Sequence, residues 1–202
     1  MIKIIWLYIL LFFIALLMGF VGAPQWIVNI VFILFVFVIL YILFYPILFE
    51  KDLKKIMRFL RKSKQSHYQF IYHMFNGDMQ VAEKSIERIR SKQLKNIDKI
   101  MLLVKQERFT DAKALLPQLR NSVYKWYYSA AIALEEKDEE AYKKFKSHLK
   151  DPIYISWLEM EEKVRLGRKD EALAMLDEQM ATLRGLKLLS AAQYQKELEE
   201  RF

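Results

Sequence analysis

Three histidines are the side chains best suited to metal binding or acid–base chemistry, and they stand at positions 67, 73 and 148. His67 and His73 are six residues apart, a spacing that puts them on different faces of a helix and makes them poor ligands of one metal ion. His148 stands near the expected end of a helix, where an imidazole usually meets terminal carbonyl groups. The chain has no cysteine, which excludes disulfides, thiolate metal sites and a cysteine nucleophile. We therefore predict no metal and no cofactor.

Carboxylates, which can act in pairs as general acid and base, gather at 135–136, 138–140, 159–162 and 197–200. They flank expected turns or alternate with lysines at helical spacing, a pattern typical of solvated faces. The chain's five glycines leave no room for a Gly-rich phosphate loop, and the His-Glu-x-x-His and Gly-x-Ser-x-Gly motifs are missing. We predict that the chain is not an enzyme and has no small-molecule substrate.

The stretch from 4 to 49 has no charged residue, serine or threonine, and Gln25 and Asn29 are its only strongly polar side chains. A break at 22–26, Gly-Ala-Pro-Gln-Trp, divides it into runs of about 18 and 23 residues. About 20 helical residues cross a bilayer core, so the pattern predicts a two-helix transmembrane hairpin over 1–50. A removable signal peptide is the alternative, which the long apolar run and Pro24 disfavour.

The net charge of +8 is concentrated beside the apolar stretch. Residues 1–64 hold eight Lys and Arg against two acidic residues, and the rest of the chain holds 24 basic against 22 acidic residues. Nucleic acid is therefore an unlikely partner, because phosphate binding needs a basic face on the folded domain. Seven of the basic residues follow the second apolar run closely. The positive-inside rule then predicts an integral two-pass protein with both termini and the helical domain in the cytoplasm.

Residues 51–64 have the pattern of a basic amphipathic helix, with apolar residues at 53, 56, 57 and 60. Such a helix can lie on the inner leaflet and contact lipid headgroups. The candidate headgroup contacts are Lys51, Lys54, Lys55, Arg58, Arg61 and Lys62. The alternative, which is compatible with the first, is that this helix packs on the first repeat of the following domain.

Residues 65–202 show a repeat of helical runs and short polar turns. An alanine opens the helix after each turn, and the spacings between these alanines are 30, 29 and 31 residues. The alanines are Ala82, Ala112, Ala141 and Ala172. A large apolar residue follows each alanine by four positions, at Ile86, Leu116, Phe145 and Leu176. A small residue lets paired helices approach closely, and a period of 20–50 residues is typical of a solenoid.

This alternation of alanine and bulky residue resembles the second helix of a tetratricopeptide repeat (TPR). The resemblance implies an all-α fold: a TPR-like α-solenoid of about four helix pairs over 65–183, preceded by the transmembrane hairpin. The period is shorter than 34, the usual aromatic signature of the first helices is absent, and Pro117 falls inside a second helix, which it should kink or shorten. After Gly185, a final helix is expected to cap the stack. A partner-binding amphipathic tail is the alternative for this helix.

The resemblance also implies a concave groove lined by the first helices, where TPR-like stacks hold peptide segments. Counting back 15 residues from each alanine predicts one row of groove residues, which includes His67, Trp126 and Trp157. Lys105 and Arg165 fall near a second row and suit an acidic peptide or carboxylate. Each of the five residues has core packing as its alternative role.

These patterns predict a membrane-anchored adaptor or scaffold that binds a protein partner, itself membrane-associated, at the cytoplasmic face. The alternative is an obligate accessory subunit of a transporter, protease or envelope-synthesis complex, assembled through its hairpin. The layout is similar to that of the inner-membrane protein associated with bacterial haem synthesis, which favours a bacterial cell membrane. That similarity is one of layout only.

Overall fold

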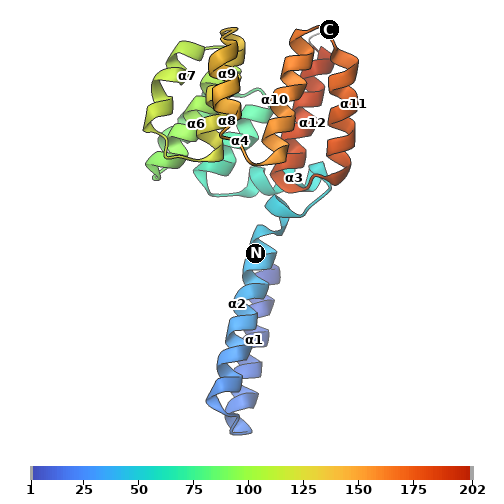
Figure 1. Ribbon diagram of the computed structural model, residues 1–202. Coiled ribbons are helices and arrows are strands. Elements are labelled where there is room, and N and C mark those ends of the chain that lie inside the picture. The colour runs from blue at the N-terminus through green and yellow to red at the C-terminus, as the bar shows by residue number, and fades with distance from the viewer. Residues whose placement is uncertain (1, 201–202) are drawn as a thin grey trace. The chain divides into compact units, whose positions relative to one another are not determined.

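A computed structural model describes the backbone of residues 2–200 and the side chains of residue 6 and residues 8–200 (Figure 1). This part of the chain forms twelve α-helices and a short 3₁₀ helix, and it contains no strand. The expected all-α fold is therefore confirmed. The chain divides into two compact units, residues 1–50 and residues 51–202.

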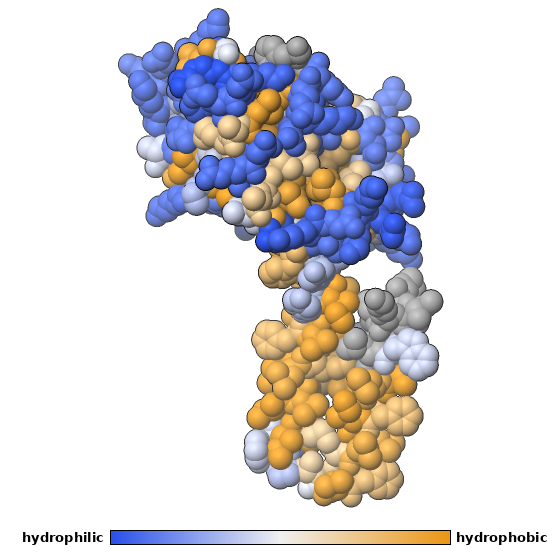
Figure 2. All heavy atoms as spheres, turned by 90° about the vertical axis from the view of Figure 1, so that its right-hand side faces the viewer, coloured by the Kyte–Doolittle hydropathy of each residue, from blue (hydrophilic) through white to orange (hydrophobic). Residues whose placement is uncertain are grey.

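The first unit consists of two apolar helices, α1 (Ile2–Phe20) and α2 (Gln25–Leu48). They lie side by side, and the rings of Tyr8 and Phe35 meet edge-on with centroids 6.0 Å apart (Figure 1). Figure 2 shows apolar side chains over the visible face of both helices. By length and composition, one helix of the described part, α2, is sufficient to cross a membrane, and the apolar segment Tyr8–Phe20 of α1 is shorter.

The second unit begins with α3 and continues as four pairs of helices before the terminal helix α12. The pairs are α4 (Ser66–Phe75) with α5 (Met79–Glu87), α6 (Lys92–Lys105) with α7 (Phe109–Leu115), α8 (Val123–Glu135) with α9 (Glu139–Lys146), and α10 (Pro152–Arg165) with α11 (Lys169–Thr182). The helix α3 spans Leu53–Lys62 and α12 spans Gly185–Glu200. Pro117 shortens the second helix of its pair as expected, because α7 ends at Leu115 and a 3₁₀ turn, Leu116–Gln118, follows.

The turns inside the four pairs repeat at intervals of 30 residues. Each turn holds one residue with a positive φ, namely Gly77 (82°), Glu107 (58°), Lys137 (59°) and Gly167 (73°). Each turn also closes with the same backbone hydrogen bond, from the amide after this residue to a carbonyl five residues before that amide. This is the left-handed helix ending known from Schellman motifs. The four bonds are Asp78 N to His73 O, Arg108 N to Leu103 O, Asp138 N to Ala133 O and Arg168 N to Lys163 O, all of 2.9 Å.

This register corrects the sequence alignment of the third pair. Ala82, Ala112 and Ala172 each lie five residues after the positive-φ residue and are fully buried. The equivalent position in the third pair is Tyr142, which is 6 % exposed, whereas Ala141 is only partly buried. The unequal spacings read from the sequence arose because Ala141 stands one residue early. The repeat is therefore regular in the structure, although tyrosine stands in place of alanine in the third pair.

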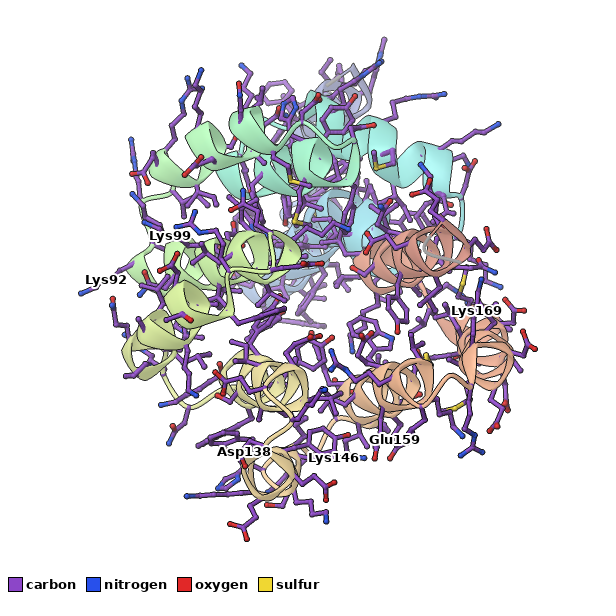
Figure 3. All side chains as sticks on the ribbon, turned by 90° about the horizontal axis from the view of Figure 1, so that it is seen from above. Lys92, Lys99, Asp138, Lys146, Glu159 and Lys169 are labelled. Carbon is purple, nitrogen blue, oxygen red and sulfur yellow. The ribbon has the colours of Figure 1, made fainter. Side chains whose placement is uncertain are left out.

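The helices at the two ends of the second unit pack on each other. The helix α12 contacts both α11 and α3, so the row of helices returns to its beginning (Figure 3). Leu189 of α12 belongs to the same buried cluster as Ile56 and Leu60 of α3 and Phe70 of α4. Because Ile56 and Leu60 are fully buried there, α3 is part of this compact unit. Of the two readings for 51–64, packing on the first repeat accounts for its apolar face.

Candidate functional site

His67, which was predicted to line the groove, lies on α4 and contacts Asp98 on α6. Among the polar contacts of the predicted groove residues that the structure describes, this one is the most buried. His67 Nδ1 lies 2.7 Å from Asp98 Oδ2. The carboxylate of Asp98 is buried, and its Oδ1 has no hydrogen-bond partner. Burial raises the pKa of Asp98 above its ordinary value, although the hydrogen bond from His67 opposes this. The predicted ligand contact His67 is thus engaged within the domain.

Lys105 and Arg165 lie at equivalent positions, since they are the last residues of the first helices α6 and α10. Each forms an ion pair with another helix, Lys105 with Glu197 of α12 and Arg165 with Glu135 of α8. Arg165 also donates to the backbone oxygen of Leu134, at 3.1 Å. Glu135 occupies the same register position in its own pair. The second predicted row is therefore a set of charges that bind one another and α12.

Trp126 makes its aromatic contacts with residues that follow α8, not with the other residues of its predicted row. Its ring stacks on the His148 ring, with centroids 4.2 Å apart, and on Phe145 of α9. In the 30-residue register, the row that holds His67 and Trp157 continues through Tyr127, not Trp126. The early alanine Ala141 caused this error of one residue. Counting from the turns would have found Tyr127, but the turn of the third pair lacks the glycine that would reveal it.

Tyr127 belongs to an aromatic cluster between α8 and α10. Its ring contacts Tyr128, Tyr154 and Trp157 with centroids 5.2–6.2 Å apart, and Tyr124 meets Tyr154 at 5.9 Å. Trp157 also donates from Nε1 to Gln179 Oε1 on α11, at 2.7 Å. Burial raises the pKa of Tyr127 and Tyr154 well above that of free tyrosine. A raised pKa keeps these phenols neutral at physiological pH, and their rings pack against one another.

The terminal helix α12 makes polar contacts with the first helices, in addition to its apolar contacts. Tyr194 donates to Glu161 of α10 at 2.7 Å, and Glu197 pairs with Lys105 of α6. At the other end of α12, Lys187 lies 3.2 Å from Asp151 and above the ring of Tyr154. Of the residues predicted for the groove, Lys105 pairs with α12, and Trp157 packs against a buried cluster that includes Leu188 and Leu198 of α12.

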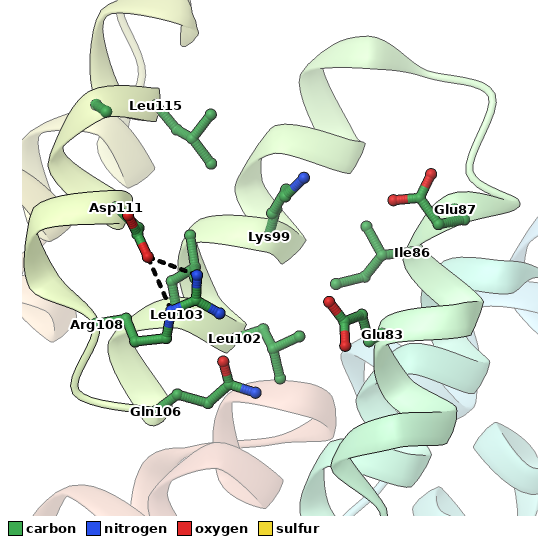
Figure 4. A pocket seen from close by; sticks show the side chains of 11 residues that line it. Glu83, Ile86, Glu87, Lys99, Leu102, Leu103, Gln106, Arg108, Asp111 and Leu115 are labelled. Atoms are coloured by element: carbon green, nitrogen blue, oxygen red, sulfur yellow. Dashed lines mark hydrogen bonds and ion pairs between the residues drawn. The ribbon is translucent and has the colours of Figure 1, made fainter.

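Helices α5, α6 and α7 border an open cleft of about 330 Å³ (Figure 4). Apolar residues line part of it, including Ile86 and Leu102, and charged residues of both signs surround these. Arg108 donates two hydrogen bonds to Asp111, of 2.5 and 2.8 Å, so this cation of the cleft is already paired with a carboxylate. Because neither sign predominates, the cleft does not select an anionic or a cationic ligand.

The basic residues of α3 occupy one exposed face of this helix. Lys54, Lys55, Arg58, Arg61 and Lys62 are all exposed, while Ile56 and Leu60 on the opposite side are fully buried. Lys51 precedes α3 and is exposed as well. The six candidate headgroup contacts are thus accessible to solvent.

No cluster of three His, Asp or Glu side chains able to hold a metal ion occurs among the described residues. No protein-family model matches the chain, and neither does a curated protein or a solved structure.

Proposed function

We propose that the chain is a membrane-anchored adaptor, whose apolar helices hold a TPR-like helical domain at the cytoplasmic face, where it binds a protein partner. The observation that carries this proposal is the contrast between the two units. Large apolar side chains of α1 and α2 are exposed, for instance Phe32 at 58 % and Phe37 at 63 %, whereas the second unit leaves few of its large apolar residues exposed. Two such helices require lipid or a membrane protein as their surroundings.

The regular pairing of helices supports the TPR-like part of the proposal. Four helix pairs repeat with a 30-residue period, and small residues at the start of three second helices are fully buried against their partners. Stacks of this kind act mainly as protein-binding surfaces, and tethering to a membrane raises the effective concentration of the domain beside other membrane proteins. The basic residues after α2 support a cytoplasmic position of the helical domain by the positive-inside rule.

A partner that enters the predicted groove has to compete with α12, which already contacts α6 and α10. The cleft between α5, α6 and α7 is open without such competition. Exposed positions around this cleft are therefore the first places at which to seek partner contacts.

The second candidate, an accessory subunit assembled through its apolar helices, is favoured by the exposed apolar faces of α1 and α2. Site-specific photo-crosslinking of the full chain in intact membranes separates the two functions. Crosslinkers replace Glu83 and Lys99 at the cleft, or Phe13 and Phe32 on the apolar helices, and mass spectrometry identifies the adducts. The adaptor proposal expects one protein to be captured from the cleft positions. Capture from the apolar helices alone would favour the accessory subunit, and capture of lipid alone at all four positions would contradict both.

A further inference from the structure

The basic face of α3 carries more charge than the folding of this helix requires. Residues 53–64 hold six Lys and Arg and no acidic residue. At about 100° per residue, the five basic residues of α3 span roughly 120° of its circumference. The buried residues Ile56 and Leu60 lie on the opposite side. Folding therefore uses the apolar face of α3 and leaves the whole basic face outward.

Four of the five cations of α3 have no counter-charge in the part of the chain that the structure describes. Lys55 has Asp52 at 4.0 Å, but Lys54, Arg58, Arg61 and Lys62 have no acidic partner among the residues that the structure describes. Some cations elsewhere in the second unit, such as Lys95, Lys113 and Lys146, lie 2.6–3.1 Å from a carboxylate, whereas the others are spread over several helices and do not form one face. An unneutralised basic face is available for an external anion.

The basic residues of α3 also repel one another. Lys54, Arg58 and Lys62 follow one another at four-residue spacing, where like charges repel. The helix dipole disfavours Lys54 and Lys55 in the first turn but favours Arg61 and Lys62 in the last turn, so it does not decide the balance. An anionic surface would relieve the repulsion between the side chains.

The length of the chain limits how far this face can be from a membrane that α2 crosses. Four residues separate the end of α2 at Leu48 from the start of α3 at Leu53. Fully extended, the chain from Leu48 to Leu53 spans at most about 17 Å. The attraction of Lys and Arg by anionic lipids acts within a Debye length of the surface, about 8–10 Å. The four-residue connection therefore allows α3 to come within that range.

We infer that the basic face of α3 docks on anionic phospholipid headgroups by charge alone, and so orients the attached helical domain on the membrane. This inference rests on the membrane anchorage proposed above. It differs from insertion of an amphipathic helix, because Ile56 and Leu60 are committed to the protein core and are not available to the acyl region. Docking should therefore be lost at high ionic strength.

The absence of cysteine from the chain allows a direct test with one engineered label. A donor dye is attached to the full chain carrying Gln65→Cys, an exposed position just after α3, and the protein is reconstituted into nanodiscs with acceptor-labelled lipid. The nanodiscs contain phosphatidylcholine alone or phosphatidylcholine with phosphatidylglycerol. We expect energy transfer to be about twofold higher with phosphatidylglycerol, and this excess to vanish in concentrated salt.

Two matched variants assign the effect to the face. One neutralises α3 by Lys54→Gln, Arg58→Gln, Arg61→Gln and Lys62→Gln, and it should abolish the excess energy transfer. The control removes the same charge elsewhere by Lys84→Gln, Lys92→Gln, Lys144→Gln and Lys150→Gln, all at exposed positions, and it should retain the excess. Thermal unfolding of both variants in neutral detergent verifies that the fold is kept.

Equal energy transfer in the two lipid mixtures, or equal loss in both variants, would overturn the inference. So would an excess that persists in concentrated salt, which indicates insertion. Failure of the anchorage has a different signature, because the full chain would then not copurify with nanodiscs of either composition.

Discussion

His67 Nδ1 lies 2.7 Å from Asp98 Oδ2, and this contact joins the first helices of two successive pairs through a fully buried carboxylate. The register explains why the contact exists. Asp98 occupies the position that Tyr128 and Leu158, both buried, hold in the next two pairs. A carboxylate at such a core position needs a partner, and His67 from the neighbouring helix supplies it.

Removal of the imidazole by His67→Ala should destabilise the second unit by about 3 kcal/mol, because a buried carboxylate loses its partner. The matched control is His73→Ala on the same helix. His73 lies 3.3 Å from Asp78, whose side chain is 55 % exposed. Water can therefore replace the imidazole of His73 as the partner of Asp78, and the loss of stability should be below about 1 kcal/mol. Urea unfolding followed by circular dichroism in detergent measures both changes. Equal losses would show that Asp98 is solvated after His67 is removed.

The free energy of unfolding of Asp98→Asn, relative to that of the wild type, should increase as the pH rises from about 4 to neutral. Burial raises the pKa of Asp98, so the folded chain holds this proton more tightly than the unfolded chain. The contribution of Asp98 is therefore most favourable at acid pH and declines as the pH passes its raised pKa. Asparagine does not ionise, yet its oxygen can still accept from His67. The difference in urea midpoints across this pH range tests the sign. An advantage that shrinks toward neutral pH would mean that attraction to His67 exceeds the cost of burial.

The sequence predicted the all-helical fold, and its alignment of the third pair was one residue out of the register that the turns show. Glycine marks the turns at 77 and 167, but Glu107 and Lys137 adopt the same positive φ without a sequence signal. The polar turn marked the third pair without fixing its register, and counting from Ala141 selected Trp126, one residue before Tyr127 in the 30-residue register. The return of α12 to α3 was also hidden, because a pattern that repeats along the chain does not indicate how tightly the stack turns. Ile56 and Leu60 read equally well as membrane-facing or core residues until α4 and α12 were placed against them.

The turns that lack glycine offer sites for stabilisation. Glu107→Gly and Lys137→Gly should each raise the free energy of unfolding by about 0.5–1 kcal/mol, because relief of the left-handed strain exceeds the added entropy of the unfolded chain. Both side chains are exposed. The reciprocal variants, Gly77→Ala and Gly167→Ala, should cost about 1 kcal/mol through the backbone alone, since an added Cβ meets no atom within 4 Å at either position. Thermal unfolding measures all four. A loss of stability in the glycine variants would show that these turns relax into another conformation.

The ion pair between Lys105 and Glu197 should hold α12 against the first helices. Its side chains are 31 % and 19 % exposed, so the pair is partly shielded from solvent. Glu197→Lys should speed hydrogen exchange in α12 about fivefold, which corresponds to about 1 kcal/mol. Combination with Lys105→Glu should restore the slow exchange. Lys196→Glu is the control, because Lys196 pairs only within α12, with Glu200, at an exposed site. If hydrogen exchange in α12 of the double variant were as fast as in Glu197→Lys, this ion pair would not be what holds α12 against the first helices.

The two-pass topology can be tested with single cysteines in an otherwise cysteine-free chain. Val21→Cys places a thiol in the turn between α1 and α2, where this residue is 81 % exposed, and Gln65→Cys places one just beyond α3. If both apolar helices cross the membrane with the charged residues inside, a membrane-impermeant maleimide added to intact cells should label the first variant and spare the second. Permeabilised cells serve as the control, since both thiols should then react. Labelling of Gln65→Cys in intact cells would place the helical domain outside. Labelling of neither would indicate that α1 and α2 do not expose their turn on the outer surface, and the two-pass arrangement would be wrong.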